Sequence, residues 1–121
     1  MKERRYRRSE DPYRALCLQL EHARTQGKLD AVVLVMSNGL LVAGSGSRDA
    51  CVALAAVAPL LGREHIRTFP PPLSENDNDI EIREVPFEGE TLYLASLGAG
   101  RSRRRWLTQS ANGVQRILSA A

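Results

Sequence analysis

Two glycine-rich segments contain the residues best placed to do chemistry, which here would be the binding of a phosphate group. Gly44–Ser47 leads from an expected strand into an expected helix, where backbone N–H groups can hold a phosphate. A dinucleotide-binding fingerprint needs a third glycine where Asp49 stands, and a P-loop needs Gly-Lys followed by Ser or Thr. Gly98–Gly100 departs from these motifs in a similar way. We therefore interpret both segments as tight turns.

Catalytic and metal-binding residues find little support in the sequence. His22 and His65 have no Cys, Asp or second His at ligand spacing, and no Gly-x-Ser-x-Gly nucleophile motif is present. Asp77 and Asp79 lack the glycine and the final glutamate of a calcium-binding loop. We expect a protein that is not an enzyme and that carries no cofactor and no metal ion.

A group of four arginines near the end of the chain is the least ordinary feature. Arg101, Arg103, Arg104 and Arg105 come just before a helix that is clear from about Arg105, and Trp106 follows them. The N-terminal end of a helix disfavours cations. Two interpretations stay open: a solvated loop before a later helix start, or a site for an anion or an acidic partner, with Trp106 as an interface anchor.

Residues 1–10 form a second basic segment, which we expect to be a flexible arm. Together, residues 2–8 and 101–105 define an alternative function, a small basic module that binds nucleic acid. Few aromatic residues accompany these charges, and no nucleic-acid recognition motif is present. A small-ligand sensor is a third possibility, but no convergent set of polar residues is available to line its pocket.

The bulk composition is that of one globular domain. The chain has 121 residues, of which 43% are hydrophobic and 26% are charged. The apolar stretch 51–61 is too short to span a bilayer, and no apolar segment of a signal peptide follows the basic N-terminus. Cys17 and Cys51 belong to no motif and suit small buried hydrophobic positions. We expect a cytoplasmic protein without membrane contact.

The net charge of +3 hides an uneven distribution. Residues 75–90 hold seven acidic side chains and one basic side chain, Arg83, whereas the rest of the chain holds seven acidic and 16 basic residues. A molecule with this charge separation can be steered toward charged partners or toward another copy of itself.

The first half of the chain predicts a helix and a hairpin. Asp11 and Pro12 suit the cap and first turn of a helix that Gly27 ends. The β-branched run 31–36 is followed by Asn38-Gly39 and a second apolar run, so we predict antiparallel strands at 31–36 and 40–45. Because the first strand is apolar on both faces, both faces of the sheet should be covered.

The second half begins with an alanine-rich helix at 48–61, which is apolar almost all round and which Pro59 should kink or end. A short strand near 66–69, strands at 80–85 and 91–97, and a last helix complete the prediction. One small domain has few elements left to cover both sides of the alanine-rich helix, which suggests a homodimer.

The stretch DAVVLVMSNGLLVAGSGSRDACVALAAVAPLL, residues 30–61, resembles the roadblock (dynein light-chain) family, including its bacterial MglB-like members. The resemblance rests on an apolar strand, the turn Ser37–Gly39, the second strand Leu40–Ala43 and the alanine-rich helix. It implies one α+β domain over residues 11–121, with about five antiparallel strands sandwiched between helices in the order α-β-β-α-β-β-β-α.

The resemblance also implies a function. It predicts a non-catalytic dimeric adaptor that binds proteins and regulates or scaffolds a small Ras-like GTPase. The helix Cys51–Leu61 would pack on its mate, and the edge strand would lie near Ile80–Val85. The predicted dimer interface therefore consists of Cys51, Leu54, Ala55, Ala58, Leu61, Ile80 and Ile82. The family supplies no catalytic residues to transfer.

Overall fold

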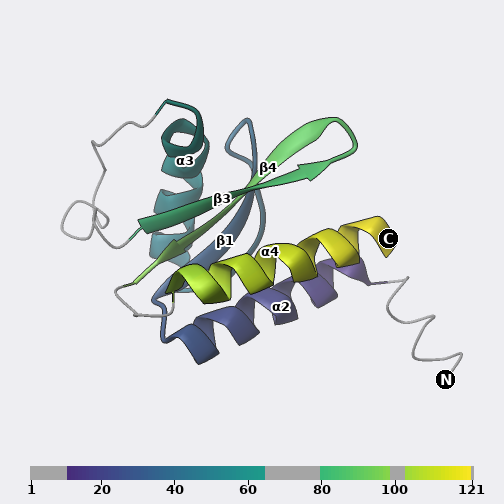
Figure 1. The fold of residues 1–121 in the computed structure, drawn as a ribbon. Coiled ribbons are helices and arrows are strands. Elements are labelled where there is room, and N and C mark those ends of the chain that lie inside the picture. The colour runs from purple at the N-terminus through teal and green to yellow at the C-terminus, as the bar shows by residue number, and fades with distance from the viewer. Residues whose placement is uncertain (1–10, 65–79, 99–102, 121) are drawn as a thin grey trace, which may run out of the picture.

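The computed structural model describes residues 11–64, 80–98 and 103–120 (Figure 1). In chain order its elements are α2 (Pro12–Gly27), β1 (Ala31–Met36), β2 (Leu41–Gly46), α3 (Arg48–Glu64), β3 (Ile80–Phe87), β4 (Glu90–Leu97) and α4 (Arg103–Ala120). Helices α2 and α4 lie side by side on one face of the sheet, and α3 lies on the other (Figure 1). The predicted α+β sandwich is confirmed.

Helix α2 begins where the sequence predicts. The carboxylate of Asp11 accepts a hydrogen bond of 2.9 Å from the Arg14 amide, and Pro12 occupies the first turn. The helix end differs by one residue, because Gly27 is still helical and Lys28 takes the left-handed cap conformation with φ of 54°. A Cβ on Gly27 would lie 3.2 Å from Trp106 Cδ1. The glycine therefore permits close packing, and the cap falls on its neighbour.

The predicted hairpin forms, with its second strand one residue later than expected. The Gly39 amide donates to the Met36 carbonyl over 2.9 Å, and Gly39 has φ of 90°. The Leu40 amide donates to the side chain of Asn38 over 3.0 Å, so the Asn-Gly pair closes the turn. The pairing register shifts between Leu34 and Val35, which marks a β-bulge in the hairpin.

The described sheet has four antiparallel strands in the order β2-β1-β4-β3. Central strand β1 pairs on both sides, Val33 lying opposite Gly44 of β2 and Ala95 of β4. β3 and β4 form a second hairpin whose tip, Glu88-Gly89, has φ of 50° and 81°. The predicted strand near 66–69 lies outside the described residues.

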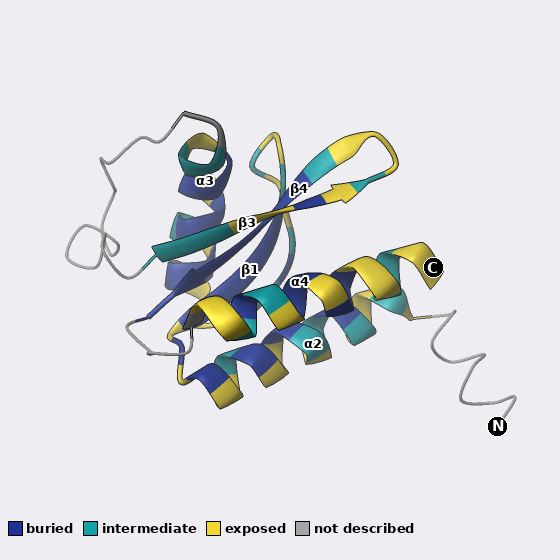
Figure 2. Ribbon diagram, viewed as in Figure 1, coloured by how far each residue is buried: buried dark blue, intermediate teal, exposed yellow. Residues whose placement is uncertain are grey.

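Two hydrophobic clusters lie on opposite faces of this sheet (Figure 2). Val33 and Val35 face α3, whereas Val32 and Leu34 face α2 and α4, so β1 is buried on both sides as predicted. The other large buried side chains that join the α2–α4 cluster are Leu16, Leu20, Leu29, Val85, Leu92, Leu94, Leu107 and Val114.

Two helix boundaries differ from the prediction. α3 continues past Pro59 to Glu64, so the proline does not end the helix. Gly62 lies against the ring of Tyr93, and this packing on β4 keeps the last turns of α3 at the sheet. α4 begins at Arg103, two residues earlier than the apolar pattern indicates.

Candidate functional site

The sheet-facing side of α3 is buried within the chain's own core. Of the predicted interface residues on this helix, Cys51, Leu54, Ala55 and Ala58 all lie in the cluster beneath α3, and Leu61 packs against it while partly exposed. The four buried side chains hold α3 to its own sheet. They position the helix, and other residues face solvent.

The apolar residues on the solvent-facing flank of α3 follow a helical spacing. Ala53, Ala56 and Leu60 stand at i, i+3 and i+7 and are half-buried or exposed. On the same side of the sheet, Leu61, Ile80 and Ile82 are also only partly buried. We call Ala53, Ala56, Leu60, Leu61, Ile80 and Ile82 the α3–β3 surface. Val52, which is 55% exposed and stands four residues before Ala56, lies next to β2 and is not included in it.

The geometry of the sheet explains why the described helices cover this surface only in part. Four strands about 4.8 Å apart make a sheet roughly 15–19 Å wide, whereas a helix is about 10 Å across. Two helices cover the α2–α4 face, but α3 alone covers only part of the opposite face. β3 is at one edge of the described sheet, and Ile80 and Ile82 on it pack against the α3 cluster while staying partly exposed. The α3–β3 surface is thus an apolar strip next to an edge strand.

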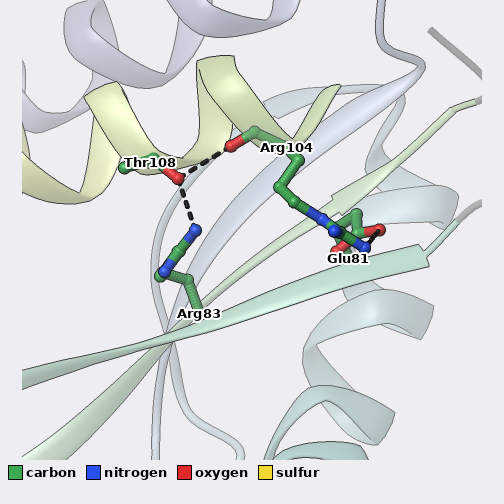
Figure 3. Close-up of polar contacts among 4 residues, drawn as sticks. All are labelled: Glu81, Arg83, Arg104 and Thr108. Carbon is green, nitrogen blue, oxygen red and sulfur yellow. Dashed lines mark hydrogen bonds and ion pairs between the residues drawn. The ribbon is translucent and has the colours of Figure 1, made fainter. Parts of the chain in front are cut away.

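The arginine cluster lies on the other side of the molecule, where α4 crosses β3 (Figure 3). Arg104 forms an ion pair of 3.5 Å with Glu81, and its side chain is 78% exposed. Arg83 donates to the Thr108 hydroxyl, which in turn donates to the Arg104 carbonyl over 2.8 Å. These contacts tie the first turns of α4 to β3 and leave a cationic ridge of Arg83, Arg104 and Arg105 at the surface.

Trp106 is half-buried between α4 and α2 rather than standing free at the surface. Its ring meets His22 of α2 edge-on, with centroids 5.7 Å apart and planes at 81°. The guanidinium of Arg105 lies 5.7 Å from the ring centroid, within reach of a cation–π interaction. Trp106 therefore anchors α4 to α2 and supports the ridge from below. Of the remaining predicted residues, Arg103 is the first residue of α4, and Arg101 lies outside the described residues.

The glycine-rich turn before α3 is explained by close packing. A Cβ on Gly46 would lie 2.5 Å from the Asp30 carbonyl oxygen, and Gly46 has φ of 126°. The Ala50 amide donates to the Ser47 hydroxyl over 3.2 Å, so a side chain caps this helix end. The turn needs no bound phosphate to account for its sequence.

Reactive groups are sparse in the described part of the chain. Burial raises the pKa of the Cys51 thiol, although nearby Arg24 acts in the opposite direction. A buried protonated thiol is a poor nucleophile. Within residues 11–64, 80–98 and 103–120, no group of three or more His, Cys, Asp or Glu residues is arranged to hold a metal ion. No helix in these ranges is long and apolar enough to cross a bilayer.

The fold that these elements build is of the roadblock type, with one helix on one face of an antiparallel sheet and a helix pair on the other. Solved structures of MglB share it. Myxococcus xanthus MglB matches at a TM-score of 0.57 and 13% identity, with 90% of this chain and 92% of that chain covered. The gliding protein MglB from Thermus thermophilus matches at 0.52 and 14% identity, over 91% and 93%.

A third solved structure, described as MglB with tetrameric arrangement, matches at a TM-score of 0.55 and 16% identity, covering 91% of this chain and 93% of that chain. No protein-family model and no curated protein matches the sequence. The similarity therefore establishes the fold, which the sequence resemblance predicted.

Proposed function

We propose that this chain is a non-catalytic, dimeric adaptor of the roadblock type that binds and regulates a small Ras-like GTPase. The observation that carries the proposal is the α3–β3 surface, an apolar strip beside a sheet edge on a fold shared with MglB. A second copy can bury this strip and extend the sheet across the edge. One neighbouring structure is described as tetrameric, which supports self-association within this fold.

An adaptor of this kind works through binding energy. A protein that binds one conformation of a GTPase switch segment more tightly shifts the population toward that conformation, without contributing a reacting group. The cationic ridge supplies a contact for an acidic partner surface, since Arg104 and Arg105 are both exposed. Both cysteines are free thiols, which fits an adaptor in the reducing cytoplasm.

The dimer is tested by charging the α3–β3 surface. Leu60→Asp places a carboxylate in the proposed interface, where an unpaired buried charge costs several kcal/mol. Light scattering should give a dimer for the unmodified chain and a monomer for the variant. Leu18→Asp is the matched control, because Leu18 is an exposed leucine on α2. A monomeric unmodified chain, or a Leu60→Asp variant that remains a dimer, would contradict the proposed interface.

The partner is tested with purified small Ras-like GTPases, each loaded with GDP or a non-hydrolysable GTP analogue. We expect one to bind in a nucleotide-dependent manner and to change its rate of GTP hydrolysis. Replacing Arg103, Arg104 and Arg105 with glutamate should weaken this binding at least ~10-fold and leave the dimer intact, because acidic residues suit a helix N-terminus. Arg14→Glu with Arg116→Glu, which reverses two exposed arginines away from the ridge, is the control for a non-specific effect of charge reversal.

If the chain binds every GTPase regardless of the bound nucleotide, or binds no GTPase at all, the proposal of a GTPase partner is contradicted even if the chain is a dimer. Tight, salt-sensitive binding to random DNA or RNA would favour the nucleic-acid alternative instead.

A further inference from the structure

A groove runs along β2, at the sheet edge opposite β3. It has a volume of about 390 Å³ and lies between the start of α2 and the start of α3. The residues that line it are Tyr13, Leu41, Val42, Ala43, Gly44, Gly46, Arg48, Cys51 and Val52. None of them belongs to the α3–β3 surface or to the cationic ridge.

The floor of this groove is a strand edge of the described sheet. β2 pairs with β1 on one side, and no described strand pairs with its other side. An edge strand presents backbone donors and acceptors to any extended chain beside it. β2 carries no lysine or proline, the residues that commonly protect such edges, and Ala43–Gly46 are all small. A second backbone can therefore approach the groove floor closely.

The walls of the groove are apolar and exposed. Tyr13 of α2 is 61% exposed and Val52 of α3 is 55% exposed, and Leu41 lies at the hairpin end of the floor. Alternate side chains of an added strand point to opposite faces of the sheet, so one set would meet Tyr13 and the other Val52. These walls favour a peptide with apolar residues on both sides.

One charge marks the α3 end of the groove. Arg48 is exposed, and none of the residues lining the groove is acidic. Arg48 stands in the first turn of α3, where the helix dipole adds to its positive potential. An acidic side chain on the occupant would neutralise this charge without competing against a groove carboxylate.

We propose that the β2 groove binds an extended, apolar peptide segment with an acidic residue, contributed by a partner protein and added to the sheet as a fifth strand. A single extended chain fits between the walls on either side of β2. A second copy of this protein is a poorer occupant, because it would bring its own Tyr13, Val52 and Arg48 to the contact and set two cations together.

The experiment is a selection from a random octapeptide library on the full chain, followed by affinity measurements with the most enriched synthetic peptide. We expect enriched sequences to alternate apolar and β-branched residues and to carry Asp or Glu. Hydrogen exchange should show new protection at β2 amides when the peptide is bound, as strand addition requires.

Three variants locate the site. Leu41→Lys places a charge at the strand edge, Tyr13→Ser removes a wall, and Arg48→Glu reverses the groove charge; each should weaken peptide binding at least ~10-fold. The controls are Leu18→Ser, an exposed leucine on the same helix as Tyr13, and Arg116→Glu on α4; both should bind as the unmodified chain does. If Leu41→Lys fails to fold, the exposed Tyr13 and Arg48 positions decide the result.

Several outcomes overturn the proposal. These are enrichment of no peptide, selected peptides that bind the three groove variants normally, or protection that appears on α3 and not on β2. An assembly larger than a dimer that Leu41→Lys dissociates, with no peptide enriched, would assign the groove to a second copy. Because Leu60 lies outside the groove, a failed dimer test leaves this experiment unaffected.

Discussion

The two faces of the sheet are covered to different degrees. On one face, α2 and α4 lie side by side, and they enclose Leu20, Leu34 and Leu94 completely (Figure 2). On the other face, α3 lies alone, with Leu54 fully buried beneath it and Ile82 only partly covered at the edge. Both clusters leave some apolar side chains partly buried at their margins, and on the α3 face those at the β3 edge are Ile80 and Ile82, next to the exposed flank of α3.

The same difference separates the two sides of α3 itself. Ala58 is completely buried against the sheet, whereas Ala56, two residues earlier, is exposed. A helix turns about 200° over two residues, so neighbouring alanines have opposite environments. A contrast between these two positions therefore distinguishes folding from association.

The largest predicted effect comes from charging these two alanines. Ala58→Arg buries an unpaired cation in a packed core and should unfold the chain, at a cost of several kcal/mol. Ala56→Arg should keep the fold, within about 0.5 kcal/mol for the monomer, and dissociate the proposed dimer. Urea unfolding followed by circular dichroism, together with light scattering, measures both effects.

If both variants unfold, the solvent-facing flank of α3 belongs to the core and the contrast between its two sides is lost. If Ala56→Arg stays dimeric with unchanged stability, the partner covers a different surface. Ala53→Ser is the mild control, because it keeps a small side chain at a half-buried position.

Local sequence signals predict much of the fold. The Asp11 cap, the Asn38-Gly39 turn and the two-sided apolar run 31–36 each specify their element through nearby residues alone. The boundaries that the sequence misplaces depend on distant contacts. α3 passes Pro59 while its end packs on Tyr93, and α4 starts at Arg103, one residue before Arg104 pairs with Glu81.

The candidate site is harder to predict from sequence. The composition of an alanine-rich helix shows that both of its sides are apolar, but it does not show which side packs on its own sheet. The predicted interface therefore contains Ala55 and Ala58, which are buried on the sheet, whereas the exposed flank carries Ala56 and Leu60. The sequence signal that could identify the exposed flank is the i, i+3, i+7 spacing of Ala53, Ala56 and Leu60. The β2 groove has no sequence signature, because Tyr13 and Val52 come together only through the sheet edge.

A smaller effect on stability is expected at two glycines inside helices, one in the helix on each face of the sheet. A Cβ on Gly62 of α3 would lie 2.4 Å from Tyr93 Cε1, a ring atom in a buried side chain. A Cβ on Gly113 of α4 would meet the end of the Gln19 side chain, which can rotate away. Gly62→Ala should therefore cost about 1–3 kcal/mol through overpacking.

Gly113→Ala should be neutral or stabilising by up to about 1 kcal/mol, the usual helix gain of alanine over glycine. Thermal and urea melts of the two variants measure the difference directly. Equal destabilisation of both would show that the α2–α4 pair is packed as rigidly as the contact between α3 and Tyr93.

The smallest predicted effect concerns the two thiols. Burial beneath α3 raises the pKa of Cys51, so the folded chain keeps this proton at pH values where the unfolded chain releases it. An unfolded thiol ionises from about pH 8.5, and above that pH the folded state binds more protons than the unfolded state. The free energy of unfolding should then fall with rising pH, by at most about 1.4 kcal/mol per pH unit for this one group.

Cys51→Ala should flatten that part of the profile measured by urea unfolding, whereas Cys17→Ala, at a half-buried position on α2, serves as the control. An unchanged profile in Cys51→Ala would mean that the thiol beneath α3 is less shielded from water than the packing of that face indicates.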